Sequence, residues 1–118
     1  MSNTVEALDQ KLNQAILTGK ALEAFDELYA EDVVMQENNA EPFAGKAFNR
    51  DREVKFFASI AEVHEVKVAA SAVSGDVSFG EWVLDVTFQG GVRYRIEQVS
   101  VRRWKDGQVV HERFYYKG

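Results

Sequence analysis

Polar side chains alternate with apolar ones in two segments near the C-terminal end of the chain. The alternate positions of these segments are occupied by Tyr94, Ile96, Gln98 and Ser100, and by Glu112, Phe114 and Tyr116. Successive side chains of a strand point to opposite faces of a sheet, so Glu112 points inward if Phe114 and Tyr116 do. A buried carboxylate, amide and hydroxyl are costly unless they pair with one another or with water. The pattern favours a water-filled pocket in which a carboxylate could transfer protons.

Two other interpretations of Glu112 stay open at this point. Its carboxylate could be hydrogen-bonded to Gln98 or a tyrosine for purely structural reasons. A β-bulge could instead reverse the inward and outward positions of the strand, because one extra residue shifts every later side chain to the other face. The same doubt applies to each face assignment in the second half of the chain.

The elements that would position these side chains change in type once along the chain. Apolar residues recur every three to four positions from about Thr4 to Thr18, with Gly19 as the terminator, and this spacing predicts an amphipathic helix. The period continues through Ala21, Phe25 and Leu28 in a second, shorter helix. A third helix is predicted from about 47 to 61, where five apolar residues would face a core. These are Phe48, Val54, Phe57, Ile60 and Ala61.

Strands and turns make up the remainder. A β-branched strand is predicted at Val33–Glu37, between the second and third helices. Further strands are expected from Val66, from Val77 to Gln89 with an interruption at Gly80, from 92 to 104 and from 109 to 116. Gly90-Gly91 and Lys105-Asp106-Gly107 mark hairpin turns. Within the strand that follows Val77, Trp82, Leu84, Val86 and Phe88 form the apolar face that must meet the helices. Helices followed by antiparallel strands indicate a single α+β domain over residues 1–118.

Three stretches carry a resemblance to a known family. They are Leu28–Met35, Glu41–Lys46 and the hairpin Trp104–Tyr116. With these stretches the chain resembles SnoaL-like proteins of the nuclear-transport-factor-2-like superfamily, which also includes the ketosteroid isomerases. The resemblance implies a cystatin-like cone in which three N-terminal helices pack on a strongly curved, mostly antiparallel sheet. It also implies a ligand cavity at the open end of the cone and, often, a homodimer formed through the outer face of the sheet.

The same resemblance assigns candidate site residues. Matching the ketosteroid isomerases places their carboxylate base at Glu37, and the SnoaL-like cyclases use a pocket acid-base carboxylate that Glu37 or Glu112 could supply. The isomerase oxyanion hole matches Leu12 and Ser100, which cannot do that job in the same way. Tyr94, Gln98 and Tyr116 are possible substrate donors, while Ser100, Trp82 and Phe57 complete the predicted substrate pocket. The alternative for Glu37 is a solvated residue with no role.

Two classes of function are consistent with these residues. The first is a cofactor-independent isomerase, cyclase or dehydratase that acts on a small apolar or carbonyl-containing compound. The alternative is a non-catalytic module that binds such a ligand or forms a dimer. We predict no metal, because the only histidines, His64 and His111, lack ligand-like spacing. We predict no cofactor, because the sequence has no glycine-rich phosphate loop and the resemblance to the SnoaL-like cyclases implies none. Ser100 lacks the glycine pattern of a nucleophile elbow, which argues against a serine hydrolase.

Charge and composition limit the partners. A net charge of −5 argues against nucleic acid. Arg93, Arg95, Arg102 and Arg103 fall in one predicted strand, where they form either a solvated surface paired with Glu97 and Asp85 or an anion site. The chain has no cysteine, no apolar run near 20 residues and no basic-then-apolar N-terminal segment, so we expect a cytoplasmic protein that does not bind membranes.

Overall fold

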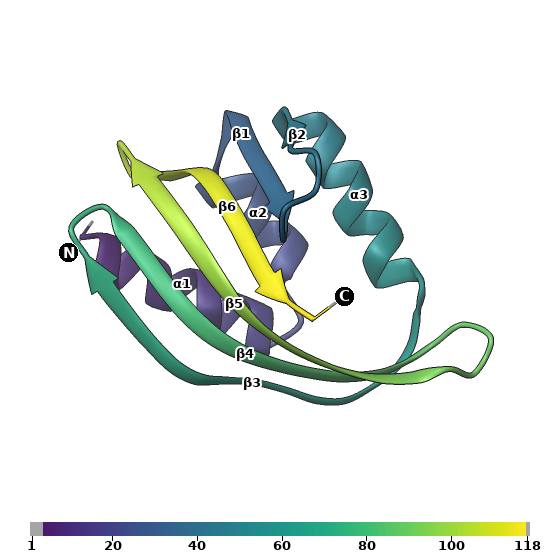
Figure 1. Ribbon diagram of the computed structural model, residues 1–118. Coiled ribbons are helices and arrows are strands. Elements are labelled where there is room, and N and C mark those ends of the chain that lie inside the picture. Colours follow the sequence, from purple (N-terminus) through teal and green to yellow (C-terminus); the bar gives the residue numbers. More distant parts are fainter. Residues whose placement is uncertain (1–3, 118) are drawn as a thin grey trace.

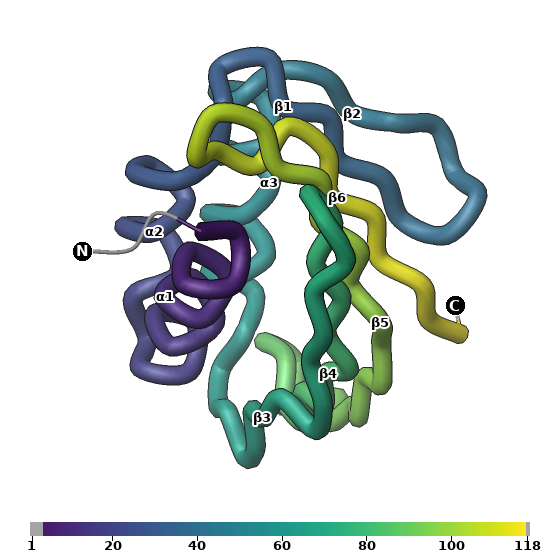
Figure 2. Tube along the Cα trace, turned by 90° about the vertical axis from the view of Figure 1, so that its left-hand side faces the viewer, coloured from purple at the N-terminus to yellow at the C-terminus, as the bar shows by residue number. Residues whose placement is uncertain are grey.

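The structure is a computed structural model that describes residues 4–117 as three helices on a six-stranded sheet (Figure 1). Along the chain the elements are α1 (Val5–Leu17), α2 (Ala21–Leu28), β1 (Tyr29–Glu37), β2 (Phe43–Ala44), α3 (Lys46–Ala58), β3 (Ile60–Ser74), β4 (Val77–Phe88), β5 (Arg93–Lys105) and β6 (Gln108–Tyr116). The strand order is β2-β1-β6-β5-β4-β3, antiparallel except for the parallel pair β1 and β6. All three helices lie on the concave side of the curved sheet (Figure 2). The predicted α+β class and curved, mostly antiparallel sheet are confirmed.

Local sequence signals set the ends of α1 and the turn between β5 and β6. Thr4 caps α1, because its hydroxyl accepts a hydrogen bond from the Ala7 amide over 3.2 Å. The helix stops before Gly19, whose φ of 80° is the left-handed conformation that glycine tolerates best. The β5–β6 turn places Asp106 at φ 53° and Gly107 at φ 78°. Two successive residues with positive φ are typical of the tight turns that suit twisted hairpins.

Two strand boundaries and one predicted interruption differ from the prediction. β1 begins at Tyr29 rather than at Val33, because α2 passes directly into the strand. β3 begins at Ile60 rather than near Val66, so His64 lies inside a strand. Three register shifts along β3 break the alternation that a sequence pattern needs. Gly80 does not interrupt β4, which pairs with β5 without a break from Val77 to Thr87.

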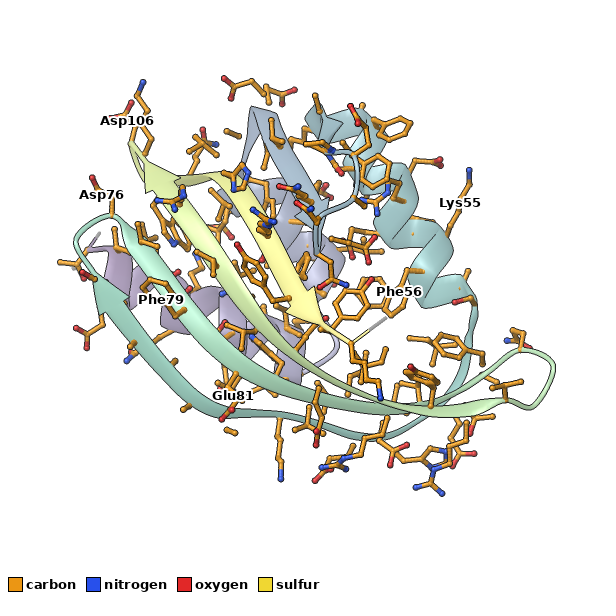
Figure 3. The ribbon with its side chains drawn as sticks, in the orientation of Figure 1. Lys55, Phe56, Asp76, Phe79, Glu81 and Asp106 are labelled. Carbon is orange, nitrogen blue, oxygen red and sulfur yellow. The ribbon has the colours of Figure 1, made fainter. Side chains whose placement is uncertain are left out.

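Helix α3 turns a different face inward from the one its apolar spacing predicted. Phe48 is 55% exposed, Phe57 is 38% exposed and Val54 is 37% exposed. Asn49 is instead the buried residue of this helix, and Figure 3 shows Phe56 directed toward the concave side of the sheet while Lys55 points away. The predicted core face of α3 was therefore wrong for Phe48 and Val54, whereas Phe57 borders the space between this helix and the sheet. Polar residues such as Asn49 occupy inward positions of α3, so the spacing of the apolar residues did not identify the inward side of the helix.

Arg102 also departs from the expected surface band. Arg93 pairs with Asp85 over 3.0 Å and Arg95 with Glu97 over 3.2 Å, so the expected pairing on the outer face is confirmed for these two. Arg102 is only 3% exposed and points into the protein. It belongs to the alternating set of β5 that includes Gln98 and Ser100, so it cannot share a face with Arg93, Arg95 and Arg103.

The main hydrophobic core lies where α1 and α2 meet β1, β5 and β6. Its buried members are Leu12, Ala24, Phe25, Leu28, Tyr29, Val33, Met35, Trp104 and Val109. Most of the apolar face of β4 lies outside this core, around an open space beneath the helices. Trp82 is 6% exposed and Val86 fully buried, as the alternation predicted. Within residues 4–117 the helices are too short or too polar to cross a bilayer.

Candidate functional site

A cavity of about 670 Å³ lies between the helices and the concave face of the sheet. Its volume is within the range of pockets that hold small molecules. Most of its wall is apolar. The apolar residues include Leu12, Ile16, Leu22, Phe25, Phe56, Phe57, Ile60, Val66, Trp82, Leu84, Ile96 and Phe114. Helices and strands that are distant in the chain supply these side chains, so the cavity exists only in the folded protein.

A buried ionic network closes one part of the cavity. Arg102 Nε donates to Glu112 Oε2 over 2.8 Å, and Arg102 Nη1 donates to Asp9 Oδ1 over 2.8 Å and to Asn13 Oδ1 over 2.6 Å. The Tyr29 hydroxyl donates to Glu112 Oε1 over 2.5 Å. Arg102 and Glu112 are 3% and 2% exposed. Charges this deeply buried are stable only when they are paired and hydrogen-bonded, as these are.

The network fixes the protonation states of Arg102 and Tyr29. Burial by itself would lower the pKa of Arg102, but the charges of Glu112 and Asp9 outweigh that effect and raise it. Burial, followed by the charge of Glu112, raises the pKa of Tyr29 well above its usual value. Tyr29 is therefore a permanent hydrogen-bond donor and Arg102 a permanent cation.

A second polar group lies where β1 and β6 end beside α3. Glu37 accepts a hydrogen bond from the Tyr116 hydroxyl over 2.7 Å and pairs with Arg52 Nη2 over 2.7 Å. Arg52 also donates to Asn49, and its guanidinium lies 3.7 Å from the ring centroid of Phe43. Partial burial, followed by the hydrogen bond to Glu37, raises the pKa of Tyr116 to about 12. The parallel pairing of β1 with β6 creates this group, since it aligns Glu37 with Phe114 near the end of the chain.

Glu53 is a further carboxyl group in the cavity wall, and it is half-buried, whereas the remaining one, Glu23, is exposed. No hydrogen bond or ion pair links the carboxyl group of Glu53 to another residue within 4–117. Burial raises the pKa of Glu53 to about 7, helped by the charges of Glu112 and Glu37 and opposed by Arg52. A carboxyl group with this pKa exists in both protonation states at neutral pH. It is suited to remove a proton and return it.

Six of the eight residues predicted for the site line this cavity: Glu37, Phe57, Trp82, Gln98, Glu112 and Tyr116. Tyr94 and Ser100 are not in its wall. Tyr94 is 49% exposed, whereas Ser100 is 1% exposed and accepts a hydrogen bond from Trp82 Nε1 over 3.2 Å. Glu37 and Glu112 belong to separate polar groups, each with its own donors. The catalytic roles expected of these two residues remain predictions.

Sequence reasoning missed Glu53, Arg102, Tyr29 and Asp9. A signal for Arg102 was present, since strict alternation puts it on the same face of β5 as Gln98 and Ser100. Glu53 lies four residues from Asn49 and three from Phe56, which is the spacing of one helical face. The apolar pattern of Phe48, Val54 and Phe57 obscured that face. No comparable signal predicted that Asp9 and Tyr29 would meet Arg102 and Glu112 across the fold.

A family model described as a SnoaL-like domain matches residues 3–116, nearly the whole chain. The chain belongs to the SnoaL-like family. A search of curated proteins found no significant match. Residues 4–117 contain no group of three or more histidine, aspartate or glutamate side chains arranged to hold a metal ion.

Solved structures of similar proteins support this family assignment. A candidate SnoaL-like polyketide cyclase from Mesorhizobium loti is 25% identical with a TM-score of 0.84, covering 96% of this chain and 99% of its own. A candidate isomerase from Bacillus subtilis is 22% identical with a TM-score of 0.79, covering 99% and 90%. An LEH-like epoxide hydrolase from M. tuberculosis is 16% identical with a TM-score of 0.76, covering 96% and 82%. The last two likenesses concern the fold alone.

Proposed function

We propose that this SnoaL-like protein is a cofactor-independent enzyme that moves a proton on a small carbonyl compound within its cavity. The observation that carries the proposal is Glu53, a cavity carboxyl group without a partner and with a pKa of about 7. Isomerases, intramolecular aldol cyclases and dehydratases can all begin with the removal of a proton next to a carbonyl group. The names of similar structures, a candidate cyclase and a candidate isomerase, are consistent with this class.

We assign the proton transfer to Glu53 and not to Glu37 or Glu112. Glu37 is neutralised by Arg52, and Glu112 accepts hydrogen bonds from Tyr29 and Arg102. Both carboxylates are therefore already engaged by donors of the protein, whereas the carboxyl group of Glu53 is not. Burial is the main cause of the raised pKa of Glu53, and the negative charges of Glu112 and Glu37 add to it.

The proposal can be tested before the natural substrate is known. Wild-type protein is incubated in deuterated buffer with uncharged ketones that fit the cavity, such as cyclohexanone, tetralone and indanone. Proton NMR then measures how fast the hydrogens next to the carbonyl exchange. We expect wild-type protein to catalyse exchange for at least one ketone, and Glu53→Gln to lower that rate by about 100-fold or more, the usual contribution of a general base.

Three further variants give this assay its specificity. Glu37→Gln should retain most of the exchange activity, since it removes a neighbouring charge and leaves the base. Glu112→Gln tests the second predicted carboxylate in the same way, provided its melting curve shows a folded protein. Glu81→Gln, on the far side of the sheet (Figure 3), is the matched control. If Glu37→Gln or Glu112→Gln abolishes exchange while Glu53→Gln does not, the base is misassigned. If wild-type protein binds ketones without exchange, it is a ligand-binding module.

We also propose a homodimer through the convex face of the sheet. Phe79, Val99 and Tyr115 are 38%, 39% and 43% exposed on that face. Strand pairing places Val99 opposite Tyr115, and Phe79 opposite Val101. These apolar side chains therefore form one patch among charged neighbours, of the kind that a sheet-to-sheet contact buries.

A further inference from the structure

The wall of the cavity formed by β5 carries two hydrogen-bond donors that the fold does not use. Arg102 donates from Nε to Glu112 and from Nη1 to Asp9 and Asn13. Its other terminal nitrogen, Nη2, has no partner within residues 4–117. Nη2 is not completely buried, because Nδ1 of His111 is the only fully buried side-chain nitrogen or oxygen without a partner in residues 4–117. Because Arg102 lines the cavity, Nη2 is the nitrogen of its guanidinium that remains free to bind a ligand there.

Gln98 is the second unused donor. Its side chain is half-buried, lines the cavity and has no hydrogen-bond partner among the described residues. It lies four residues before Arg102 on the same face of β5, opposite Trp82 on one side and Tyr116 on the other. A half-buried amide without a partner is expected to bind water or a ligand.

Trp82 provides an apolar surface between these two donors. The Arg102 guanidinium carbon lies 5.8 Å from the centre of the Trp82 ring, and Gln98 is the strand partner of Trp82. The indole is held in place by its hydrogen bond to Ser100. A flat, apolar ligand on Trp82 would therefore have an open donor near either side.

Arg102 is held rigidly, which matters for binding a developing negative charge. Its three partners fix the guanidinium before any ligand arrives, and it is almost completely buried. A fixed positive group in a site sheltered from water stabilises a charge that appears during a reaction, because nothing has to reorganise. The unpartnered carboxyl group of Glu53 lines the same cavity from α3.

We propose that the β5 wall is the oxyanion-binding side of this cavity, with Arg102 Nη2 and the Gln98 amide as its donors, and that the substrate is an uncharged carbonyl compound. This inference rests on the proposed function. The substrate lies with its oxygen against β5 and its acidic C–H bond toward Glu53. The Glu53 carboxylate takes the proton, the C–H electron pair forms a carbon–carbon double bond, and the carbonyl π pair moves to oxygen. The resulting enolate is neutralised when Glu53 returns the proton to carbon.

The balance of charge argues for an uncharged substrate. Each cation of the cavity is already paired, Arg102 with Glu112 and Asp9, and Arg52 with Glu37. Glu53 adds a further acidic group. A carboxylate or phosphate substrate would bring a full negative charge into the cavity in addition to the carboxyl group of Glu53, and like charges repel. A neutral carbonyl becomes negative only during the reaction, and only at its oxygen.

Naphthols are suitable probes, because the ionised form resembles an aromatic enolate and differs from the neutral form in absorption and fluorescence. We would titrate 2-naphthol and its cyano- and nitro-substituted relatives into the protein at a pH at which each free naphthol is still neutral. We expect binding to tighten as the naphthol becomes more acidic, and the bound spectrum to be that of the naphtholate. Glu53→Gln should still bind the most acidic naphthols as naphtholates, since it leaves the β5 donors in place.

Variants of the two donors complete the test. Gln98→Leu should weaken naphtholate binding by about tenfold, as expected for one hydrogen bond to a charged group. Gln108→Leu, an exposed position on β6, is the matched control and should bind as wild type does. Arg102→Lys keeps the charge and loses the fixed fork of donors, so a folded variant should show a smaller fraction of naphtholate. If that variant does not fold, Gln98→Leu decides the question.

The possible results separate this inference from the proposed function. Binding of neutral naphthols alone, with an affinity independent of acidity, would overturn the oxyanion side even if Glu53→Gln abolished ketone exchange. Equal binding by Gln98→Leu and Gln108→Leu would remove Gln98 from it. If naphtholates bind and ketone exchange does not depend on Glu53, the oxyanion site is correct and the base is misassigned.

Discussion

Four glutamates line one cavity, and their surroundings give them different chemistry: Glu23 is exposed, whereas Glu37, Glu53 and Glu112 are at least partly buried. Glu112 accepts from Tyr29 and Arg102, and Glu37 accepts from Tyr116 and Arg52. Glu53 has neither a donor nor a cation bonded to it within the described chain. Hydrogen bonds and opposite charges favour the ionised form of a carboxyl group, whereas burial and like charges favour the neutral form. The absence of a partner together with partial burial is the reason for proposing Glu53 as the proton carrier.

The raised pKa of Glu53 predicts how its ionisation affects stability. The folded pKa of about 7 exceeds the reference value of 4.5, so folded protein holds a proton that unfolded protein has already released. Glu53 thus contributes stability below about pH 4.5, and this contribution is lost as the pH rises through about 7. Partial exposure limits the effect to roughly 2 kcal/mol.

Urea unfolding of wild type and Glu53→Gln at about pH 5 and pH 8 measures this effect. Glutamine cannot ionise, so the stability of the variant relative to wild type should improve by roughly 2 kcal/mol between the two pH values. Other groups titrate in both proteins and cancel in the comparison. The same relative stability at both pH values would mean that Glu53 titrates normally.

Sequence alternation located some of the cavity residues and could not locate Glu53. Glu112, Gln98 and Tyr116 lie on inward faces of strands, where a period of two is enough to find them. The state of Glu53 depends on how far its carboxyl group lies from Glu112 and Glu37, which belong to other elements. Those distances are set by packing between segments far apart in the chain, so no local pattern contains them.

At the scale of elements, β4 and β5 shape the polar end of the cavity through a close approach at Gly80. A Cβ atom added to Gly80 would lie 2.7 Å from Trp82 Nε1 and 3.2 Å from Ser100 Oγ. The backbone of Gly80 does not have the positive φ that requires glycine. The need for glycine is therefore steric, since the Trp82 indole crosses over it to reach Ser100.

Gly80→Ala should force Trp82 out of its position and break the hydrogen bond to Ser100. We expect a loss of about 1–3 kcal/mol, typical of an overpacked interior, and a change in tryptophan fluorescence. Ser100→Ala removes the hydrogen bond without adding volume and should cost only about 1 kcal/mol. Thermal unfolding of both variants gives the comparison. A Gly80→Ala protein with wild-type stability and fluorescence would show that the indole can move aside freely.

Helix α3 shows why periodicity can identify an element and still misplace its faces. The apolar spacing of Phe48, Val54 and Phe57 predicted a helix at the right place in the chain. The helix lies at the rim of the cavity, so its inward face carries Asn49, Arg52 and Glu53 along with Phe56. A method that assumes apolar inward positions misplaces the face of a helix wherever polar side chains of that helix line a cavity.

At the scale of the whole molecule, the order of helices and hairpins followed from the sequence, whereas the contacts between distant strands did not. Glycine pairs and turn residues indicated where β4, β5 and β6 reverse direction. The parallel pairing of β1 with β6 and the shift in the β5–β6 register between Arg103 and Trp104 have no local signal. Both are needed to bring Arg102 opposite Glu112 and Glu37 beside Tyr116.

The proposed dimer makes a prediction about the convex face. Val101 lies beside Phe79 in the apolar patch, and Val101→Glu would put a charge into any contact that buries it. We expect this variant to sediment as a smaller species than wild type at the same concentration, with an unchanged melting curve at low concentration. A wild-type sedimentation profile in the variant would exclude this face as the interface.

The pH dependence of ketone exchange by wild-type protein tests the central claim most directly. If Glu53 is the base, the rate should rise as its carboxyl group ionises, pass its midpoint near about pH 7 and then level off, and Glu53→Gln should abolish this profile. A midpoint near the ordinary pKa of a glutamate, or the same profile in wild type and Glu53→Gln, would contradict the account.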